Sequence, residues 1–580
     1  MKFNEVGHYF DLIEQKSSRT AVTELLAELF EQANAREAQI ICNLSLGQLH
    51  PPYIGTQFNM AEKKLFKVVA QLLGESVEEI KKAKKKTGDI GTPVMDGKWK
   101  PIGDPTVVQV YDELCKIEET SGTGSQEKKA SELLKLLKSL DPTSAKFVVR
   151  IVLGKLRIGF SEMTLVDALS WMCIGDKSLR KKIEHAYNIC VDIGLIAARL
   201  KKDGIKGIEH MKIEVGIPIR PAAAERLPSA KAIVDKLGDC VAQPKLDGFR
   251  LQVHVKKKKS GKREIHFFSR NLQDMSSMFP DLEKVFEKLP IDSLICEGEA
   301  IVFDPSTGSF LPFQETVKRK RKHGIEAAME QLPLQFFIFD LLYLNGESLL
   351  SDTHEQRRKM LQDLFKNFKN NVIKVVEEKK IETAKELEDY FNANIAAGLE
   401  GLVVKRLDSM YTPGKRNFNW IKLKRQEEGR LDDTLDCVIL GYYDGSGRRA
   451  KFGIGAFLVG VLHKTKDCFE TVAKVGTGLS DDAWVDLKKR CDEIAVKIKP
   501  KNVECAKELY PDVWVSPEII CLICADEITL SPTHVAGKTE KNLGYALRFP
   551  RFMGYRPDKS VDEATTVKEI RQLYKNQFKR

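Results

Sequence analysis

The spacing of hydrophobic residues in the first part of the chain predicts helices. In SQEKKASELLKLLKSL (125–140), four leucines recur three and four positions apart and so share one helical face, with Ser125 as the predicted N-cap. The four are Leu133, Leu136, Leu137 and Leu140. The next segment, DPTSAKFVVRIVLGKLRIGF (141–160), continues the pattern. We therefore predict an all-α domain over residues 1–217.

The pattern changes near residue 216. The segment VGIPIRPAAAERLP (215–228) is rich in proline and predicts an extended linker. Over residues 218–425, strand-like alternation is mixed with helical segments such as TAKELEDYFNANIAAG (383–398), which predicts an α/β or α+β domain. From 426 to 580, short strands between glycine turns predict a small closed β-barrel followed by a tail.

The composition agrees with a globular protein of several domains. Of 580 residues, 42% are hydrophobic and 30% are charged, and the net charge of +11 suggests a polyanionic partner. No apolar run approaches the roughly 18 residues that a membrane helix needs, so we expect no membrane association. The twelve cysteines are scattered and the first residues lack the apolar core of a signal peptide, so we expect a cytoplasmic protein with reduced thiols.

A lysine lies at the start of a strand-like run in VAQPKLDGFRLQVHV (241–255). This lysine, Lys245, could be a solvated charge at a strand end or a nucleophile. The next segment forms a hairpin about the basic turn KKKKSGKR (256–263), and symmetric pairing predicts Arg250 opposite Ser269, with Arg270 alongside. Two arginines beside one lysine repel unless an anion lies between them, which is typical of a phosphate pocket.

Carboxylates and further lysines follow in other β-rich segments. The period of two places Glu297 and Glu299 on one face of SLICEGEAIVFD, Glu400 lies in GLEGLVVKR, and Lys422 and Lys424 share a face in NWIKLKR. Any one of these pairs could be the alternating charge of a surface strand. Taken together they fit one chemistry, in which carboxylates hold Mg²⁺, cations bind phosphates and a lysine attacks phosphorus.

Several motifs then occur in the order seen in ATP-dependent DNA ligases. They are KLDGFR (245–250), FSRN (268–271), CEGEA (296–300), FFIFDLLYLNGESL (336–349), EGLVVK (400–405), WIKLK (420–424) and ALRFPRF (546–552). The N-terminal AKFVVRIVLGKLRIGFSEMTLVDALS and the tail DEATTVKEIRQLY also resemble this family. Essentially the whole chain is similar to the archaeal replicative ligases and their eukaryotic relatives. RNA ligases and mRNA capping enzymes share the KxDG motif but not the helical N-terminal domain.

The resemblance implies a mechanism. In the family, the lysine of KxDG, here Lys245, attacks the α-phosphate of ATP and expels pyrophosphate. AMP then passes to the 5′-phosphate of a DNA nick, and the 3′-hydroxyl displaces it. A free lysine is protonated near neutral pH, and we expect neighbouring cations such as Arg250, Lys422 and a bound Mg²⁺ to lower the pKa of Lys245.

The resemblance also assigns roles to other residues. It implies that Arg250 and Arg270 contact ribose and phosphates, that Glu299 contacts the ribose or orders the metal, and that Glu400 helps to hold the metal. Phe339 is expected to stack on adenine, although its segment could also be a plain core strand. The remaining implied contacts are Arg416 with the nucleotide, Lys422 and Lys424 with the α-phosphate, and Arg548 and Arg551 with the leaving pyrophosphate.

One position departs from the family pattern. Two residues before the lysine, the family usually has Glu, which accepts a hydrogen bond from the adenine amino group, and this chain has Gln243. A glutamine carbonyl can accept the same bond without charge, but its NH₂ could turn to suit guanine. We therefore expect discrimination between ATP and GTP to be some tenfold weaker than a carboxylate would give.

The resemblance predicts three domains and several partners. They are a helical DNA-binding domain (1–217), an adenylation domain of antiparallel sheets (218–425) and an OB-fold barrel with its tail (426–580). We expect a monomer that binds nicked duplex DNA, with KKKKSGKR and KRKRK (318–322) as either DNA contacts or solvated turns. The loop GTPVMDGKWKPIGD (91–104) lacks a sliding-clamp peptide, so a clamp partner stays open. The rival functions are an RNA-directed nucleotidyltransferase and a DNA-binding scaffold without catalysis.

Overall fold

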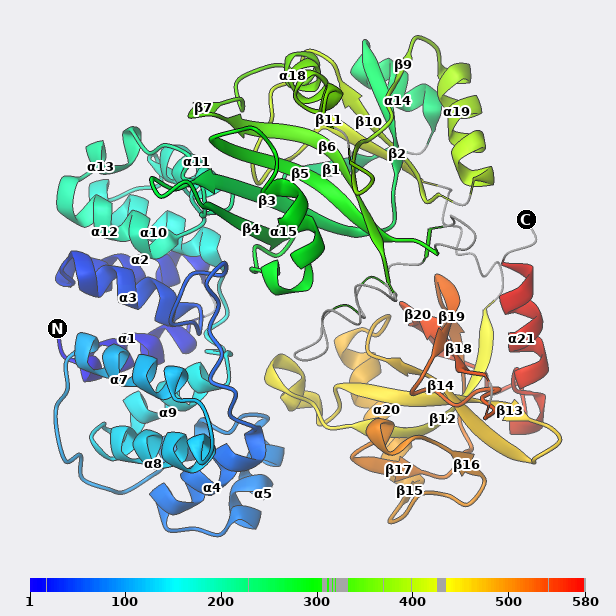
Figure 1. Ribbon diagram of the computed structural model, residues 1–580. Helices are drawn as coiled ribbons and strands as arrows, with labels where there is room; N and C mark the ends of the chain where they lie inside the picture. Colours follow the sequence, from blue (N-terminus) through cyan, green and yellow to red (C-terminus); the bar gives the residue numbers. More distant parts are fainter. Residues whose placement is uncertain are drawn as a thin grey trace. The chain divides into compact units, whose positions relative to one another are not determined.

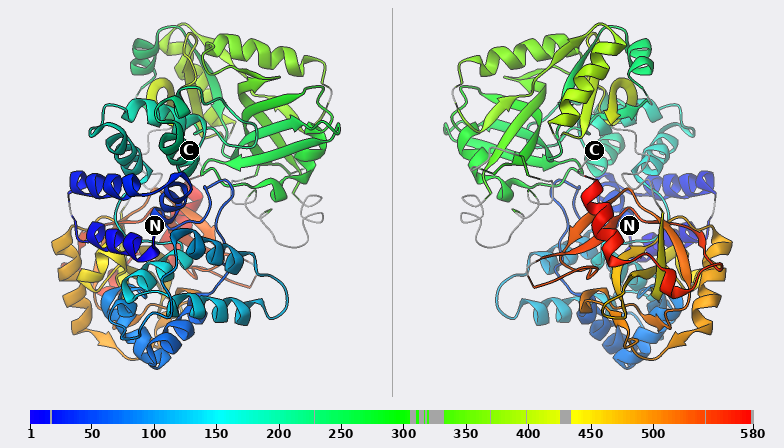
Figure 2. Two further views of the ribbon diagram at one scale, coloured as in Figure 1. Left: turned by 90° about the vertical axis from the view of Figure 1, so that its left-hand side faces the viewer. Right: turned by 90° about the vertical axis from the view of Figure 1, so that its right-hand side faces the viewer.

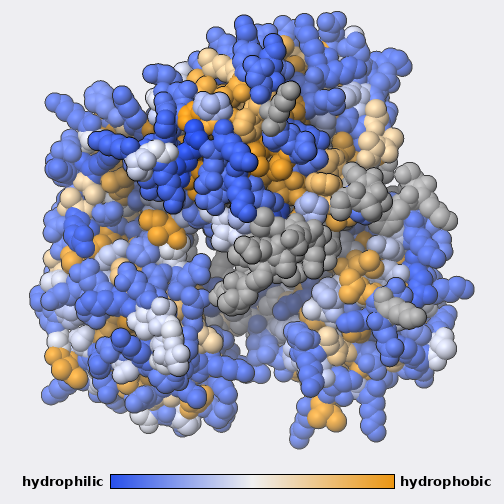
Figure 3. All heavy atoms as spheres, viewed as in Figure 1, coloured by the Kyte–Doolittle hydropathy of each residue, from blue (hydrophilic) through white to orange (hydrophobic). Residues whose placement is uncertain are grey.

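The computed structural model divides the chain into two compact units. It describes residues 1–577 apart from 17, 228, 305–309, 312–315, 317–318, 320–331, 369, 398, 425–433 and 541. The first unit contains Met1–Val68 and Lys98–Arg425, and the second contains Val69–Gly97 and Gln426–Arg580. On the face drawn in Figure 3, polar residues dominate, and hydrophobic residues gather over the strands of the first unit. None of the described helices is long and apolar enough to cross a membrane.

The N-terminal region is helical, as predicted, and its described residues are drawn in Figure 2 as blue and cyan helices joined by loops. Its helices are α1 (Phe3–Glu14), α2 (Arg19–Gln32), α3 (Ala35–Ser45), α4 (Glu62–Leu73), α5 (Val77–Thr87), α6 (Thr92–Met95), α7 (Val107–Glu119), α8 (Ser125–Lys138), α9 (Pro142–Val152), α10 (Glu162–Ile174), α11 (Arg180–Ile189), α12 (Ile193–Asp203) and α13 (Lys206–Glu209). The four leucines of α8 and the turn after it are buried, which confirms the predicted face. The predicted N-cap is wrong, because Gly124 in the left-handed conformation is the N-cap and Ser125 is the first helical residue.

A five-stranded sheet carries the KxDG motif. Its strand order is β1 (Ala223–Arg226), β11 (Arg416–Lys424), β10 (Gly401–Arg406), β2 (Cys240–Lys245) and β9 (Lys379–Ile381). All neighbours are antiparallel except β1 and β11. Two helices, α14 (Ala230–Leu237) and α19 (Ala384–Ala396), pack on this sheet (Figure 1), and their apolar residues join its core.

A six-stranded sheet follows the motif. The strand order is β4 (Arg263–Ser269), β3 (Phe249–Lys257), β5 (Ser293–Val302), β6 (Leu334–Leu344) and β7 (Glu347–Ser348), and β8 (Ile373–Val375) also pairs with β6. The described residues of this part also include the helices α15 (Pro280–Phe286) and α18 (His354–Lys366). Apart from the parallel pairs β1 with β11 and β6 with β8, the two sheets together bear out the prediction of an α+β domain with antiparallel sheets.

The predicted register of the β3–β4 hairpin is wrong by one residue. Leu251, not Arg250, lies opposite Ser269. The turn holds an odd number of residues between the strands, with Gly261 at φ +83°, and the backbone N–H of Lys258 donates to the carbonyl of Lys262. The predicted register assumed a turn with an even number of residues, and the odd number shifts the pairing by one residue.

The predicted linker is extended, but it is also built into the adenylation part. Ile219 is fully buried, and its backbone N–H and C=O both bond to the side-chain amide of Gln252 on β3. The backbone N–H of Gly216 donates to Nδ1 of the buried His254. These contacts satisfy the backbone groups that a buried segment would otherwise leave unpaired.

The C-terminal part is a sheet domain. It contains β12 (Leu435–Tyr443), β13 (Ala456–His463), β14 (Cys468–Val475), α20 (Asp481–Glu493), β15 (Ala495–Val496), β16 (Val503–Glu504), β17 (Val513–Val515), β18 (Ile520–Cys524), β19 (Glu527–Ser531), β20 (Gly544–Arg548), β21 (Arg551–Tyr555) and α21 (Val567–Asn576). The main sheet runs β15-β17-β12-β13-β14-β16, and β18 joins β12 to β21. Because β19 and β20 pair only with each other among the described strands, the pairing forms half of a barrel, and the predicted closed barrel is not confirmed.

Candidate active site

Lys245 lies at the end of β2, where three strands of one sheet bring charged residues together. Gly401, the first residue of β10, pairs with Lys245 on one side and with Lys424 at the end of β11 on the other. Glu400, the residue before Gly401, forms ion pairs with both Lys245 and Lys424. Gly401 has φ +146°, and a Cβ atom there would lie 2.2 Å from the carbonyl oxygen of Leu423. Glycine therefore permits the close strand contact that sets Glu400 between the lysines.

The charge balance around Glu400 favours its ionised form. Burial alone would raise the pKa of this carboxyl group, but the ammonium groups of Lys245 and Lys424 outweigh burial and hold the pKa below its usual value. The three side chains are each about a quarter exposed, at 23%, 27% and 22% for Lys245, Glu400 and Lys424. The cluster is therefore charged and open to a ligand.

Further cations surround Lys422, which lies on β11 two residues before Lys424 and on the same face of the strand. The pKa of Lys422 is lowered first by burial and then by the repulsion of nearby positive charges. Those charges belong to Lys424, Arg416, Lys245 and Arg270. The structure thus brings together five of the cations singled out in the sequence, and such a group is suited to a polyphosphate.

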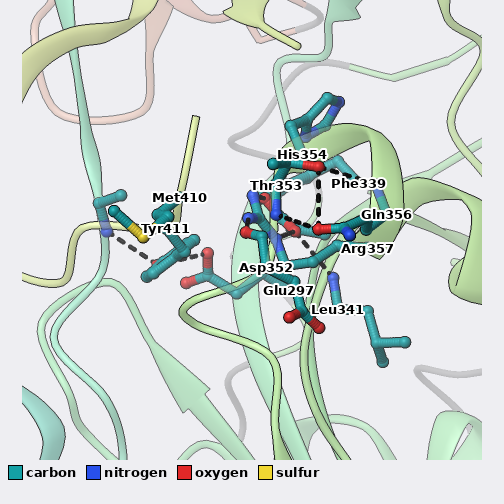
Figure 4. Close-up of polar contacts among 12 residues, drawn as sticks. Glu297, Phe339, Leu341, Asp352, Thr353, His354, Gln356, Arg357, Met410 and Tyr411 are labelled. Atoms are coloured by element: carbon teal, nitrogen blue, oxygen red, sulfur yellow. Dashed lines mark hydrogen bonds and ion pairs between the residues drawn. The ribbon is translucent and has the colours of Figure 1, made fainter. Parts of the chain in front are cut away.

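Arg250 is held by a buried carboxylate. Its Nη2 donates to Oε2 of Glu297 at 2.8 Å, and its Nη1 donates to the carbonyl oxygen of Ala222 at 3.1 Å. The hydroxyl of Tyr411 also donates to Oε2 of Glu297 at 2.8 Å, and Figure 4 shows Tyr411 beside this glutamate. Burial raises the pKa of Tyr411 well above its usual value, so the phenol stays a donor. Glu297 is fully buried and already has its hydrogen bonds, so it has no free oxygen for a metal ion.

Glu299, two residues along β5, has a different environment. It pairs with Arg250 across the β3–β5 ladder, and burial raises its pKa to about 7 against the opposing charges of Arg250 and Lys245. Gly248 of the KLDG segment approaches it closely, since a Cβ atom at that glycine would lie 2.9 Å from Cγ of Glu299. Glu299 and Glu400 therefore both lie close to Lys245. Two carboxylates beside a phosphate site are a suitable donor set for Mg²⁺, which takes one or two carboxylates together with phosphate oxygens.

Phe339 lies on β6 in a half-buried aromatic group. The guanidinium of Arg250 lies 5.3 Å from its ring centroid, and the ring of Trp420 is 6.1 Å away in an edge-to-face arrangement. The buried Lys405 donates to the carbonyl oxygen of Phe339 at 2.9 Å, and burial lowers the pKa of Lys405 to about 8. Phe339 is thus beside the predicted phosphate-binding residues, and its ring is only partly covered.

Gln243 is buried on β2, two residues before Lys245 and on the same face of the strand. Its Nε2 donates to Oε2 of Glu378 at 2.7 Å. Glu378 also pairs with Nε2 of His354 at 2.9 Å. The NH₂ of Gln243 is therefore already bonded to the protein.

The remaining predicted residues lie elsewhere. Arg548 and Arg551 are in the second unit, where they pair with Glu527 at 2.6 Å and with Asp526 at 2.8 Å. The segment 318–322 lies outside the described residues except for Arg319, which is buried and pairs with Asp281 at 2.8 Å.

Sequence reasoning missed several residues that support the site. They are Tyr411, Trp420, Lys405, Glu378 and His354. Trp420 and Lys405 lie inside the WIKLK and EGLVVK motifs, but no spacing assigns them a role. Tyr411, Glu378 and His354 lie outside the quoted motifs, and their contacts come from segments that are distant along the chain.

Family models cover most of the chain. A model described as the DNA ligase N terminus matches residues 2–170, one for the ATP dependent DNA ligase domain matches 221–424, and one for the ATP dependent DNA ligase C terminal region matches 450–559. Together with the fold and the cluster around Lys245, these matches define the class of protein, an ATP-dependent enzyme that joins DNA ends.

Full-length relatives agree. A probable DNA ligase of Dictyoglomus turgidum is 46% identical over 100% of this chain and 98% of its own length. A DNA ligase of Pyrobaculum islandicum is 37% identical over 100% and 99%, and DNA ligase 1 of Methanosarcina acetivorans is 35% identical over 99% of each chain. The chain belongs to the ATP-dependent DNA ligase family, and it seals nicks in duplex DNA with ATP. A solved structure called Pmar-Lig_PreS3 shares the fold, with a TM-score of 0.56 at 16% identity over 95% of this chain and 99% of that one.

Proposed function

We propose that Lys245 is the nucleophile that forms a covalent lysine–AMP intermediate. The Nζ of Lys245 attacks the α-phosphorus of ATP, the bond from that phosphorus to the pyrophosphate oxygen breaks, and a phosphorus–nitrogen bond replaces it. The 5′-phosphate of the nick then takes AMP from the lysine, and the 3′-hydroxyl displaces AMP to join the strand. The observation that supports this proposal is that Lys245, Glu400, Lys424 and Lys422 lie together at one end of the neighbouring strands β2, β10 and β11.

The neighbours of Lys245 supply the rest of the step. Attack requires the neutral amine, so the proton of the Lys245 ammonium leaves to solvent first, and Oε2 of Glu400 lies against Nζ of Lys245, where it holds the amine in position. Lys422 and Lys424 neutralise the charge that develops on the α-phosphate. Arg250, Arg270 and Arg416 bind the ribose and phosphates, and Phe339 stacks on the base.

Mg²⁺ fits beside these groups. Glu299 and Glu400 would hold it, and it would supply charge neutralisation at the phosphates when bound. Because Glu299 has a raised pKa of about 7, its proton and the metal compete for the same oxygens near neutral pH.

We further propose the domain plan that the sequence suggests. It comprises a DNA-binding domain (1–217), an adenylation domain (218–425) and an OB-fold domain (426–580) whose barrel closes beyond the half seen in the strand pairing. Arg548 and Arg551 of the last domain orient the leaving pyrophosphate. The protein acts as a cytoplasmic, nucleoid-associated monomer on nicked duplex DNA, and a sliding clamp stays a candidate partner. The absence of disulfides among its twelve cysteines supports a reducing compartment.

Covalent labelling tests the proposal. Incubated with Mg²⁺ and ATP labelled at the α-phosphate, the wild type should retain acid-labile label, and Lys245→Ala should retain none. Lys256→Ala, at an exposed end of β3, is the matched control and should label like the wild type. Undiminished labelling of Lys245→Ala would overturn the mechanism.

A further inference from the structure

Gln243 has one end of its amide bonded and the other end free. The residue is 2% exposed, and its Nε2 donates to Oε2 of Glu378 at 2.7 Å. Within the described part of the chain, its carbonyl oxygen Oε1 accepts no hydrogen bond. Gln243 lies on the same face of β2 as Lys245, so the free oxygen belongs to the nucleotide side of the strand.

Glu378 is itself held in place. It lies between β8 and β9, and Nε2 of His354, the first residue of α18, bonds to its Oε2 at 2.9 Å. Arg358 approaches its other oxygen at 3.8 Å. His354 is 1% exposed, and Figure 4 shows it at the start of its helix. Burial would raise the pKa of Glu378, but the hydrogen bond with His354 and the charge of Arg358 outweigh it and lower the pKa. Glu378 is therefore an ionised carboxylate with little freedom to move.

An ionised carboxylate accepts hydrogen bonds and donates none. The NH₂ of Gln243 must face it, because turning the amide by half a rotation would set Oε1 against a negatively charged oxygen. The turned form would lose one charge-assisted hydrogen bond, which makes it roughly tenfold to a hundredfold less populated. The bond to Glu378 thus fixes which end of the Gln243 amide is the donor, and it leaves Oε1 as the end that can accept a hydrogen bond from a ligand.

We propose that Glu378 is a positioning residue for nucleotide selection: it locks the amide of Gln243 so that Oε1 reads the base as an acceptor and favours ATP over GTP. Adenine carries an amino donor at the position where guanine carries a carbonyl oxygen. An acceptor fixed at this position forms a hydrogen bond with the amino group of adenine and repels the carbonyl oxygen of guanine. The inference rests on the proposed function, in which the base lies beside Gln243, and it reverses the looser selectivity expected from glutamine alone.

The test compares two nucleotides on the full-length protein. Initial rates of Lys245 labelling are measured with ATP and with GTP, each labelled at the α-phosphate, for the wild type, Glu378→Gln and Glu377→Gln. We expect the wild type to favour ATP at least tenfold. Glu378→Gln should lower the ratio of the two rates by about tenfold or more, because the introduced amide can donate as well as accept. Glu377, the exposed neighbour, is the matched control, and its ratio should not change.

Exchanging the glutamine and the glutamate between positions 243 and 378 gives a second test. Gln243→Glu alone should impair labelling, because it sets two carboxylates against each other at hydrogen-bond distance. The double variant Gln243→Glu/Glu378→Gln should restore labelling and the preference for ATP, since the pair again has one donor and one carboxylate. A merely structural role for Glu378 would change the rates with both nucleotides together and leave their ratio constant.

The outcomes separate the inference from the proposed function. Near-equal labelling of the wild type by ATP and GTP would overturn the inference whatever the variants do, and so would an unchanged ratio in Glu378→Gln. No labelling of the wild type by either nucleotide would instead contradict the role of Lys245.

Discussion

Replacing Glu297 by glutamine should loosen the contact between β3 and β5 at the centre of the site. The fully buried Glu297 accepts hydrogen bonds on one oxygen from Arg250 and Tyr411, each at 2.8 Å. Its other oxygen accepts from Nε2 of Gln252 at 3.3 Å. Glu297→Gln keeps the shape of the side chain, but it removes the charge and turns one acceptor into a donor.

The magnitude follows from these three contacts. If the new carbonyl oxygen faces Arg250 and Tyr411, the bond from Tyr411 becomes neutral and the bond from Arg250 loses its ionised acceptor, with a loss of about 1 kcal/mol each. The new NH₂ then faces the NH₂ of Gln252, and that lost bond costs about 1 kcal/mol more. The opposite orientation leaves the guanidinium of Arg250 facing a donor, which is worse. We expect a loss of about 3 kcal/mol, in line with the 3–5 kcal/mol typical of breaking a buried ion pair.

Native-state hydrogen exchange measures this loss locally, which suits a protein of several domains. Amides in peptides from β3 and β5 should exchange about 100-fold faster in Glu297→Gln than in the wild type, because about 1.4 kcal/mol corresponds to a factor of ten. The matched control is Glu264→Gln on β4. Glu264 is 41% exposed and pairs at 3.3 Å with Lys258, which is 53% exposed. Such surface pairs contribute little, so exchange should change by about twofold at most.

The result that would refute this reasoning is a protection loss in Glu297→Gln no larger than that in Glu264→Gln. It would mean that Arg250 and Tyr411 keep their positions without the charge of Glu297. A slow-down of Lys245 labelling with unchanged exchange would also contradict it, since the effect on the site is expected to come through the loosened strands.

Two further predictions concern the metal and DNA. The proton on Glu299 leaves as pH rises through its pKa of about 7, so the carboxylate fraction should rise from roughly a tenth at pH 6 to roughly nine tenths at pH 8. The Mg²⁺ concentration that gives half-maximal labelling should fall over this range in the wild type, and this component should vanish in Glu299→Gln. For the full chain, the logarithm of the affinity for duplex DNA should fall linearly with the logarithm of salt concentration, by about 0.9 per phosphate neutralised, with little dependence on sequence. Affinity that does not respond to salt would argue against a phosphate interface.

The sequence predicts helices and strands better than it predicts how the strands pair with one another. The buried leucines on one face of α8 follow from local periodicity. On β3 the alternation of apolar and polar residues predicts a strand but not its burial, because Gln252 and His254 are buried along with the apolar residues beside them. The hairpin register does not follow, because it depends on the turn. The same basic segment is compatible with a loop of five residues and with a loop of an even number of residues. The left-handed conformation of Gly261 and the hydrogen bond between the backbones of Lys258 and Lys262 determine the five-residue loop. Closure of a barrel likewise depends on which strands pair with each other, and the residues of one strand do not determine its pairing partner.

The site shows the same division. The motif residues are local in sequence, so Lys245 and its neighbours on β2, β10 and β11 could be singled out. Their supports come from far along the chain. Glu378 is 135 residues from Gln243, and Tyr411 is 114 residues from Glu297. Neither has a special spacing, and an isolated glutamate in a charged segment such as VVEEKK is indistinguishable from a surface residue.

The two glutamates of the CEGEA segment show why the pattern alone does not assign roles. Both have the same residue type, the same strand and the same predicted face. In the fold, Glu297 meets Arg250 and Tyr411 and is saturated by hydrogen bonds, whereas Glu299 stays partly exposed next to Lys245 with a pKa of about 7. A saturated carboxylate can only orient its partners, and a carboxylate poised between charged and neutral can exchange a proton for a metal ion. The division of labour within this strand is therefore set by the partners that tertiary folding brings to each oxygen.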